Sequence, residues 1–143
     1  MSQSALRIAH TLREVVDVVT QVGAVFVRYS AGPEADAACR SMDYESGVEL
    51  PGLSVAVLTP EPWWTRPRED WVARRLCKYD ELLDGDRFPW LLTGDKVGWG
   101  PDHEPLVRMR QPLARVGTRA LDEARHLYEV RFEVGKDSRS TGS

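Results

Sequence analysis

The stretch Ala24-Val25-Phe26-Val27-Arg28-Tyr29 decides the fold class, because it places a buried strand directly after a helical segment. Its valines and aromatic residues favour a strand. Residues 5–22 carry apolar side chains at three- and four-residue spacing, which predicts an amphipathic helix. Ser4 is the expected N-cap of that helix and Gly23 its expected end. The apolar positions are Leu6, Ala9, Leu12, Val16 and Val19.

Helices and strands continue to mix along the rest of the chain. The pattern predicts a short helix from Pro33, a strand over 53–58 and a helix over about 68–83, with an apolar stripe of Val72, Leu76, Tyr79 and Leu83. It then predicts a short strand over 88–93, a glycine-containing loop over 94–103 and a strand over 104–109 that is interrupted near Pro112 and resumes to 116. A helix capped by Thr118 and a last strand over 129–134 are expected to follow. Pro89 indicates that the strand over 88–93 starts at an edge. The expected class is α+β: one domain over 1–134, a mixed or antiparallel sheet, about three helices and a disordered tail over 135–143.

Charge and cysteine content narrow the function classes. The 143 residues include 19 Lys and Arg and 22 Asp and Glu, for a net charge of −3. No global basic field is available to attract nucleic acid or an anionic membrane. Cys39 and Cys77 form no C-x-x-C pair, which with the lack of a signal peptide favours a reducing cytoplasm. These observations leave open whether the binding partner is a small molecule or another protein.

Common catalytic and metal motifs are missing or incomplete. Gly52-Leu53-Ser54-Val55 begins like a nucleophile elbow, but Ala56 stands where the final glycine belongs. There is no Walker loop, and the cysteines and histidines lack zinc spacing. We therefore assign no metal and no certain cofactor.

Three polar residues lie where predicted strands begin or end: Arg28, Ser54 and Glu104. Such residues can face a cleft while their strands hold them in place. Each also has a structural interpretation. Arg28 can pair with Asp36 or Asp43, Ser54 can satisfy a backbone group, and Glu104 can pair with an arginine.

The order of these three residues resembles the R-S-E pattern of ADP-ribosyltransferases. In that family, the Arg contacts the NAD phosphates or ribose, the Ser positions the nicotinamide ribose, and the Glu stabilises the oxocarbenium-like transition state. The resemblance implies Glu104 and Ser54 as catalytic residues, and Arg28, Ser30 and Tyr44 as cofactor-binding residues, with Tyr44 or Trp63 stacking on nicotinamide. NAD would then be the substrate. The family motif is usually Ser-Thr-Ser, and here it is Ser54-Val55-Ala56.

Longer segments resemble a family of small bacterial proteins, typical of actinobacteria, that is known only as a domain of unknown function. The resemblance runs from Arg28 to Leu106 and implies no activity. Its segments include Asp43-Tyr44-Glu45-Ser46-Gly47, Leu50-Pro51-Gly52-Leu53-Ser54, Pro62-Trp63-Trp64 and Asp70-Trp71-Val72-Ala73-Arg74.

Two further hypotheses concern loops. The proline-rich segment 60–67 carries Trp63 and Trp64, and exposed tryptophans are common anchors at interfaces. Neighbours in an extended segment point to opposite faces, so one of the two is expected to be buried and the other partly exposed. The second hypothesis is a small-molecule pocket in the loop 95–104, where Asp102, His103 and Glu104 form a compact acid/base group.

Overall fold

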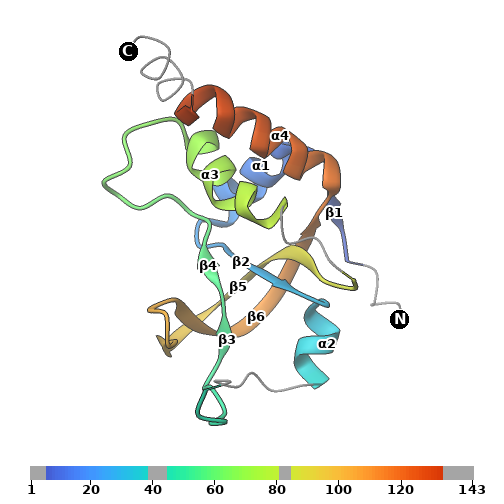
Figure 1. Cartoon of the computed structure of the whole chain (residues 1–143), viewed down its shortest axis with the longest axis vertical. Helices are drawn as coiled ribbons and strands as arrows, with labels where there is room; N and C mark the ends of the chain where they lie inside the picture. Colours follow the sequence, from blue (N-terminus) through green and yellow to red (C-terminus); the bar gives the residue numbers. More distant parts are fainter. Residues whose placement is uncertain (1–5, 39–44, 81–84, 134–143) are drawn as a thin grey trace.

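A mixed sheet and a group of helices form the domain, as expected for the α+β class. The computed structural model describes residues 6–38, 45–80 and 85–133. Three longer helices gather at one end of the sheet (Figure 1). Their bounds are α1 Leu12–Val22, α3 Arg68–Asp80 and α4 Thr118–Tyr128, and α2 Pro33–Ala38 is shorter. The strands are β1 Ile8–Ala9, β2 Phe26–Ser30, β3 Leu53–Ser54, β4 Ala56–Val57, β5 Phe88–Trp99 and β6 Pro105–Val116.

The sheet has the order β1-β6-β5-β2-β4, with β3 paired to β6. Among the described strands only β1 and β6 pair in parallel, so the sheet is mixed. The expected strand over 53–58 is one extended segment interrupted at Val55. Leu53–Ser54 pairs with β6 and Ala56–Val57 pairs with β2, so β6, β5 and β2 curve into a half-barrel. Val55 is 5% exposed, and its N–H donates to the carbonyl of Pro105 at 3.1 Å.

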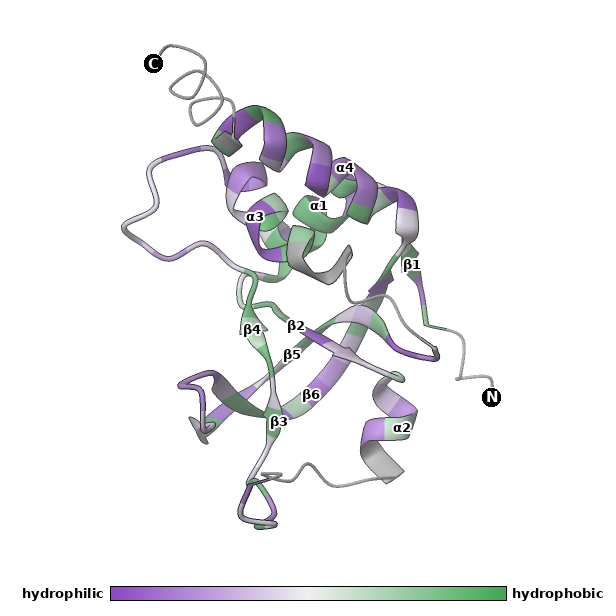
Figure 2. Ribbon diagram, viewed as in Figure 1, coloured by the Kyte–Doolittle hydropathy of each residue, from purple (hydrophilic) through white to green (hydrophobic). Residues whose placement is uncertain are grey.

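Strand neighbours divide the buried side chains between two apolar clusters, because successive side chains point to opposite faces. Val27 and Leu91 join the cluster against α1, α3 and α4. Phe26 and Trp90 lie in the second cluster, inside the curved sheet. Figure 2 shows apolar residues where α1, α3 and the sheet face one another.

The first helix begins later than its periodicity predicts. Thr11, not Ser4, caps α1: its Oγ1 accepts a hydrogen bond from the N–H of Glu14 at 3.1 Å. Ala9 fits the helical spacing but is buried as part of β1, paired with Val116. The helix ends at Gly23 as predicted, where φ is 93°.

The predicted loop over 94–103 is largely strand, so that prediction was wrong. β5 runs to Trp99, and only the turn from Gly100 to Glu104 connects it to β6. Gly94 is required inside the strand because a Cβ there would lie 2.6 Å from the carbonyl oxygen of Arg108. β5 is a central strand, not an edge strand, because it pairs with both β2 and β6. At Pro89 it pairs with β2 alone, since the pairing with β6 starts at Trp90.

The last predicted strand is also wrong. Residues Glu129–Glu133 form a π-helical turn, η1, that continues α4. The β-branched and aromatic residues there suggested a strand, but Phe132 stacks on Tyr128 at 5.0 Å between ring centroids. The helix predicted from Pro33, the strand at 24–29 and the last helix are confirmed as α2, β2 and α4. Thr118 does not cap α4, because Gly117 occupies the N-cap position.

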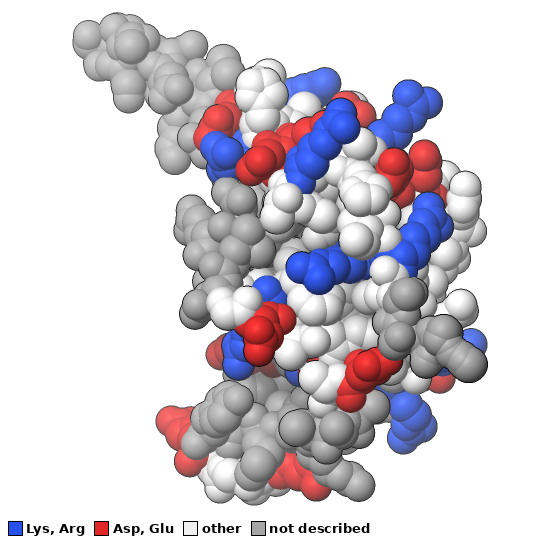
Figure 3. Space-filling model, turned by 90° about the vertical axis from the view of Figure 1, so that its right-hand side faces the viewer, with Lys and Arg blue, Asp and Glu red and all other residues white. Residues whose placement is uncertain are grey.

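Acidic and basic side chains are interspersed on the face that Figure 3 shows. No helix among the described residues is long and apolar enough to cross a membrane.

Candidate functional site

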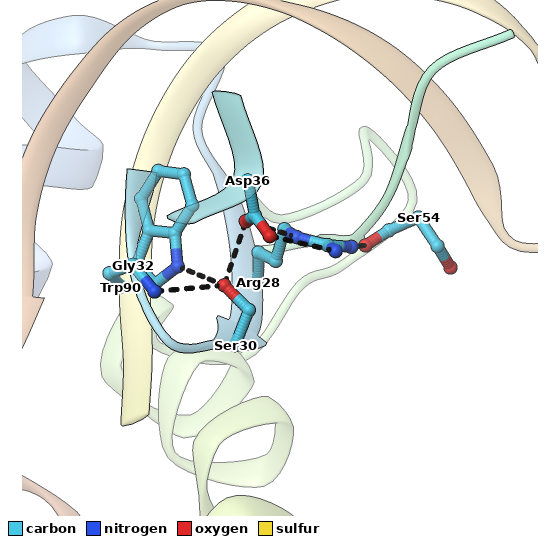
Figure 4. Close-up of polar contacts among 6 residues, drawn as sticks. All are labelled: Arg28, Ser30, Gly32, Asp36, Ser54 and Trp90. Atoms are coloured by element: carbon cyan, nitrogen blue, oxygen red, sulfur yellow. Dashed lines mark hydrogen bonds and ion pairs between the residues drawn. The ribbon is translucent and has the colours of Figure 1, made fainter. Parts of the chain in front are cut away.

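The guanidinium of Arg28 on β2 is held by a carboxylate from α2. Its Nε donates to Oδ2 of Asp36 at 2.6 Å, and its Nη2 donates to Oδ1 at 3.2 Å (Figure 4). Its Nη1 donates to the backbone carbonyl of Ser54 at 2.8 Å. The two charged side chains are only 16% and 11% exposed. The structural interpretation of Arg28, pairing with Asp36, is therefore confirmed.

Ser30 completes this polar group. Its hydroxyl donates to Oδ2 of Asp36 at 2.7 Å and accepts from Nε1 of Trp90 at 2.9 Å. The N–H of Gly32 also donates to this hydroxyl, at 3.2 Å. The Ser30 proton and both acceptor positions are thus engaged inside the protein, as Figure 4 shows.

Glu104 lies at the end of the β5–β6 turn and reaches Ser54 across the sheet. The Ser54 hydroxyl donates to Oε2 at 2.6 Å, and the N–H of Asp102 donates to Oε1 at 2.9 Å. A Cβ on Gly100 would lie 2.4 Å from the carboxyl carbon, so this glycine makes room for the carboxylate.

Hydrogen bonds keep the Glu104 carboxylate ionised. Burial raises the pKa of this carboxyl. The hydrogen bonds from Ser54 and from the N–H groups of Glu104 and Asp102, together with the charge of His103, lower it by more. The net pKa lies below the ordinary 4.5. Glu104 is therefore a fixed anion near neutral pH, suited to stabilise positive charge and poorly suited to donate a proton.

The structure brings Arg28, Ser54 and Glu104 together in one hydrogen-bonded chain. Ser54 is the middle member: its carbonyl accepts from Arg28 and its hydroxyl donates to Glu104. Within the described residues, Asp36 and Ser54 engage three of the five N–H donors of Arg28. Tyr44 lies outside the described residues, so its predicted stacking role stays a prediction.

A second candidate site is a half-open groove of about 620 Å³, here called the tryptophan groove. The loop before α3, α3 itself and the end of α4 line it, through Glu61, Trp63, Trp71, Arg74, Arg75, Cys77 and Tyr128. Trp63 is 67% exposed and stacks edge-on against Trp71, with 5.7 Å between ring centroids. Trp64 is half-buried, and its Nε1 donates to the carbonyl of Pro67 at 3.0 Å.

The comparisons with known proteins identify a family but no activity. Residues 2–140 match the model of a family of unknown function (DUF6098). The chain belongs to this family. Neither the comparison with curated proteins nor the comparison with solved structures gave a match. What this DUF6098 protein does must therefore be inferred from its own residues.

Sequence reasoning found Trp63 but missed the other residues that line the groove in this DUF6098 protein, and Trp64, which it also singled out, is not one of them. Trp71, Arg74 and Arg75 follow one another at helical spacing on α3, so they share a face. That spacing was a usable signal. Tyr128 comes from α4, and nothing in the sequence shows that it meets this face.

The predicted acid/base group at 102–104 is split by the turn. Asp102 and His103 are exposed, whereas Glu104 turns inward to Ser54. His103 has a φ of 63°, a left-handed conformation that belongs to a tight turn. No group of three or more metal-ligating side chains is found within the described ranges.

Proposed function

We propose that this protein is a binding module whose small-molecule site is the tryptophan groove. The observation that carries the proposal is a concave site of about 620 Å³ beside a tryptophan that is 67% exposed. Ligand pockets are typically about 300–1,000 Å³ and are lined by aromatic side chains with a few polar groups. Trp63 and Tyr128 supply aromatic lining with the 3% exposed Trp71 beneath them, and Glu61, Arg74 and Arg75 supply the polar groups.

The concave shape favours a small molecule over a protein partner. A stable protein interface buries roughly 800 Å² on each side and needs a broad complementary surface. A small ligand needs only the groove itself.

The groove contains its own reporter for a test. Cys39 and Cys77 are the two cysteines of the chain, and Cys77 lines the groove. In a Cys39→Ser background, the rate at which iodoacetamide alkylates Cys77 should fall when a compound occupies the groove. A fragment library is screened this way, and each hit is confirmed by calorimetry.

Two tryptophan variants serve as test and control. Trp63→Ala should abolish protection of Cys77 by every hit. Trp99→Ala should not, because Trp99 is similarly exposed, at 60%, but lies at the end of β5 outside the groove. A library without a single hit, or hits equally sensitive to both variants, would remove the proposal. Binding of another protein that depends on Trp63, without any small-molecule hit, would favour an interaction module instead.

The second candidate is an ADP-ribosyltransferase-like domain that binds or consumes NAD. The hydrogen-bonded chain of Arg28, Ser54 and Glu104 favours it, because the three residues that the resemblance implied lie in contact. In hydrolysis, the bond from the ribose anomeric carbon to nicotinamide breaks, and nicotinamide leaves with the electron pair. Water then adds to the carbon and releases a proton. Glu104, ionised by its surroundings, would stabilise the positive sugar.

The Arg28–Asp36 pair sets a condition on this candidate. Asp36 already pairs with the guanidinium, so an NAD phosphate would have to use N–H donors of Arg28 that Asp36 and Ser54 do not engage.

Nicotinamide release, followed by NMR, tests the second candidate. Glu104→Gln should lose most turnover, whereas Glu34→Gln, on the exposed side of α2, should keep it. Intact NAD with the wild-type protein, or equal turnover by both variants, would remove this candidate.

A further inference from the structure

We propose that the tryptophan groove selects a planar organic anion: a flat ring joined to one carboxylate or phosphate group, with the oxyanion on Arg74. This inference rests on the proposed binding function and assigns its ligand class. The groove offers the two kinds of surface that such a molecule needs, an aromatic wall and a cationic edge, on neighbouring elements.

The aromatic wall is available for stacking. Trp63 contacts Trp64 and Trp71 edge-on, with interplanar angles of 67° and 69°. Despite these contacts Trp63 keeps 67% of its surface exposed, so much of the indole is uncovered. A flat ring covering it would gain both the burial of apolar area and the ring-on-ring contact.

The cationic edge comes from consecutive residues of α3. The guanidinium of Arg75 lies over the ring of Trp71 at 4.8 Å, and that of Arg74 lies 6.0 Å from the ring of Phe132. Within the described part of the chain, no carboxylate pairs with Arg74. A guanidinium beside an aromatic ring keeps its N–H groups for a planar, bidentate contact with a carboxylate or phosphate.

The lining carries both signs of charge. Among the described residues of the groove are two arginines, Arg74 and Arg75, and one acid, Glu61. A ligand with one anionic group therefore fits better than a polyanion, because further negative charge would meet Glu61.

The volume sets the ligand size. About 620 Å³ holds a bicyclic ring with a short arm to the oxyanion. Aromatic carboxylates and nucleoside monophosphates share this chemistry, and they form the two arms of the test.

The experiment measures calorimetric affinities of the full chain for matched pairs of probes. The first pair is indoleacetate and its neutral amide, and the second is adenosine monophosphate and adenosine. In at least one pair, the anion should bind about tenfold tighter than its neutral partner, as expected for one charge-assisted bidentate contact. A high salt concentration, which shortens the Debye length from about 10 Å to about 3 Å, should weaken only the anion.

Arginine variants locate the anion site. Arg74→Gln should weaken the anion about tenfold and leave the neutral probe unchanged. Arg108→Gln, an exposed arginine on β6 outside the groove, should leave both affinities unchanged. Which pair shows the preference tells a carboxylate ligand from a phosphate ligand.

Three results would overturn the assignment of an anion. One is equal affinity within both pairs, another is equal effects of Arg74→Gln and Arg108→Gln, and the third is no binding by any of the four probes. If the charged and neutral probes of each pair bind equally well and Trp63→Ala weakens both, the preference for an anion is rejected while the proposed binding function stands. If the fragment screen fails as well, the proposed function is rejected too.

Discussion

The pair formed by Arg28 and Asp36 should contribute strongly to stability, and Asp36→Asn tests this. The carboxylate accepts two hydrogen bonds from Arg28 and one from Ser30, at 2.6 to 3.2 Å. Both charged side chains are more than four-fifths buried. Removing one member of a buried ion pair costs about 3–5 kcal/mol, because it leaves an uncompensated charge.

The expected cost lies below that range for two reasons. Some solvent reaches both groups, and the Asn oxygen can still accept one hydrogen bond. We therefore expect Asp36→Asn to lower the free energy of unfolding by about 2–3 kcal/mol. With a urea m-value of about 2 kcal/mol/M, the unfolding midpoint should fall by about 1–1.5 M.

Urea unfolding followed by circular dichroism measures this change. The control is Asp95→Asn, which breaks the pair with Arg110 at 3.0 Å, whose side chains are 52% and 70% exposed. Such a pair is worth about 0.2–1 kcal/mol. Arg28→Met combined with Asp36→Asn should cost less than the sum of the single changes, because the double variant has no buried cation. If Asp36→Asn is no more harmful than Asp95→Asn, the reasoning about this buried pair is wrong.

Three further predictions concern local contacts. Because the folded pKa of Glu104 lies below 4.5, its carboxylate should stabilise the protein above that pH. The free energy of unfolding in urea should therefore differ between wild type and Glu104→Gln above pH 4.5. This difference should shrink as the pH falls below about 4.5 and passes the lower pKa of the folded protein. A difference that does not change with pH would contradict the lowered pKa of Glu104. Gly100→Ala should lower the melting temperature, at a cost of about 1–2 kcal/mol, because its Cβ would push the Glu104 carboxylate away from its hydrogen bonds with Ser54 and Asp102. Gly98→Ala, with open space around the new Cβ, is the calorimetric control, and equal losses would refute the steric argument. Thr11→Ala should cost about 1 kcal/mol in thermal unfolding through loss of the α1 cap, whereas Thr118→Ala, whose predicted capping role falls to Gly117, should cost less.

The sequence was most informative where side-chain period and burial agree. The valines and aromatic residues of β2 and the breaks at Gly23 and Pro33 placed three elements correctly. The same reasoning placed Arg28, Ser54 and Glu104 at strand ends. Ser54 ends β3 and Glu104 directly precedes β6, but Arg28 lies in the middle of β2. Hydrogen bonds nevertheless join the three residues.

Long-range packing caused the errors. The glycines over 94–100 suggested a loop, but Gly94 lies within β5, where the absence of a Cβ lets the backbone of β6 approach closely. Ala9 matched a helical stripe, although pairing with Val116 determines its conformation. The tryptophan groove depends on how α3 meets the end of α4, and no local signal in either helix predicts that contact.

The segment 53–57 protects two strands from unwanted association. A strand without a neighbour presents unpaired N–H and C=O groups to other chains. This segment covers part of β6 through Leu53 and Ser54, and part of β2 through Ala56 and Val57. Local opening at Val55 would therefore expose both strands in one step. Hydrogen exchange at these two places should share one opening free energy, and substitutions that loosen Val55 should promote intermolecular β-pairing before they unfold the helices.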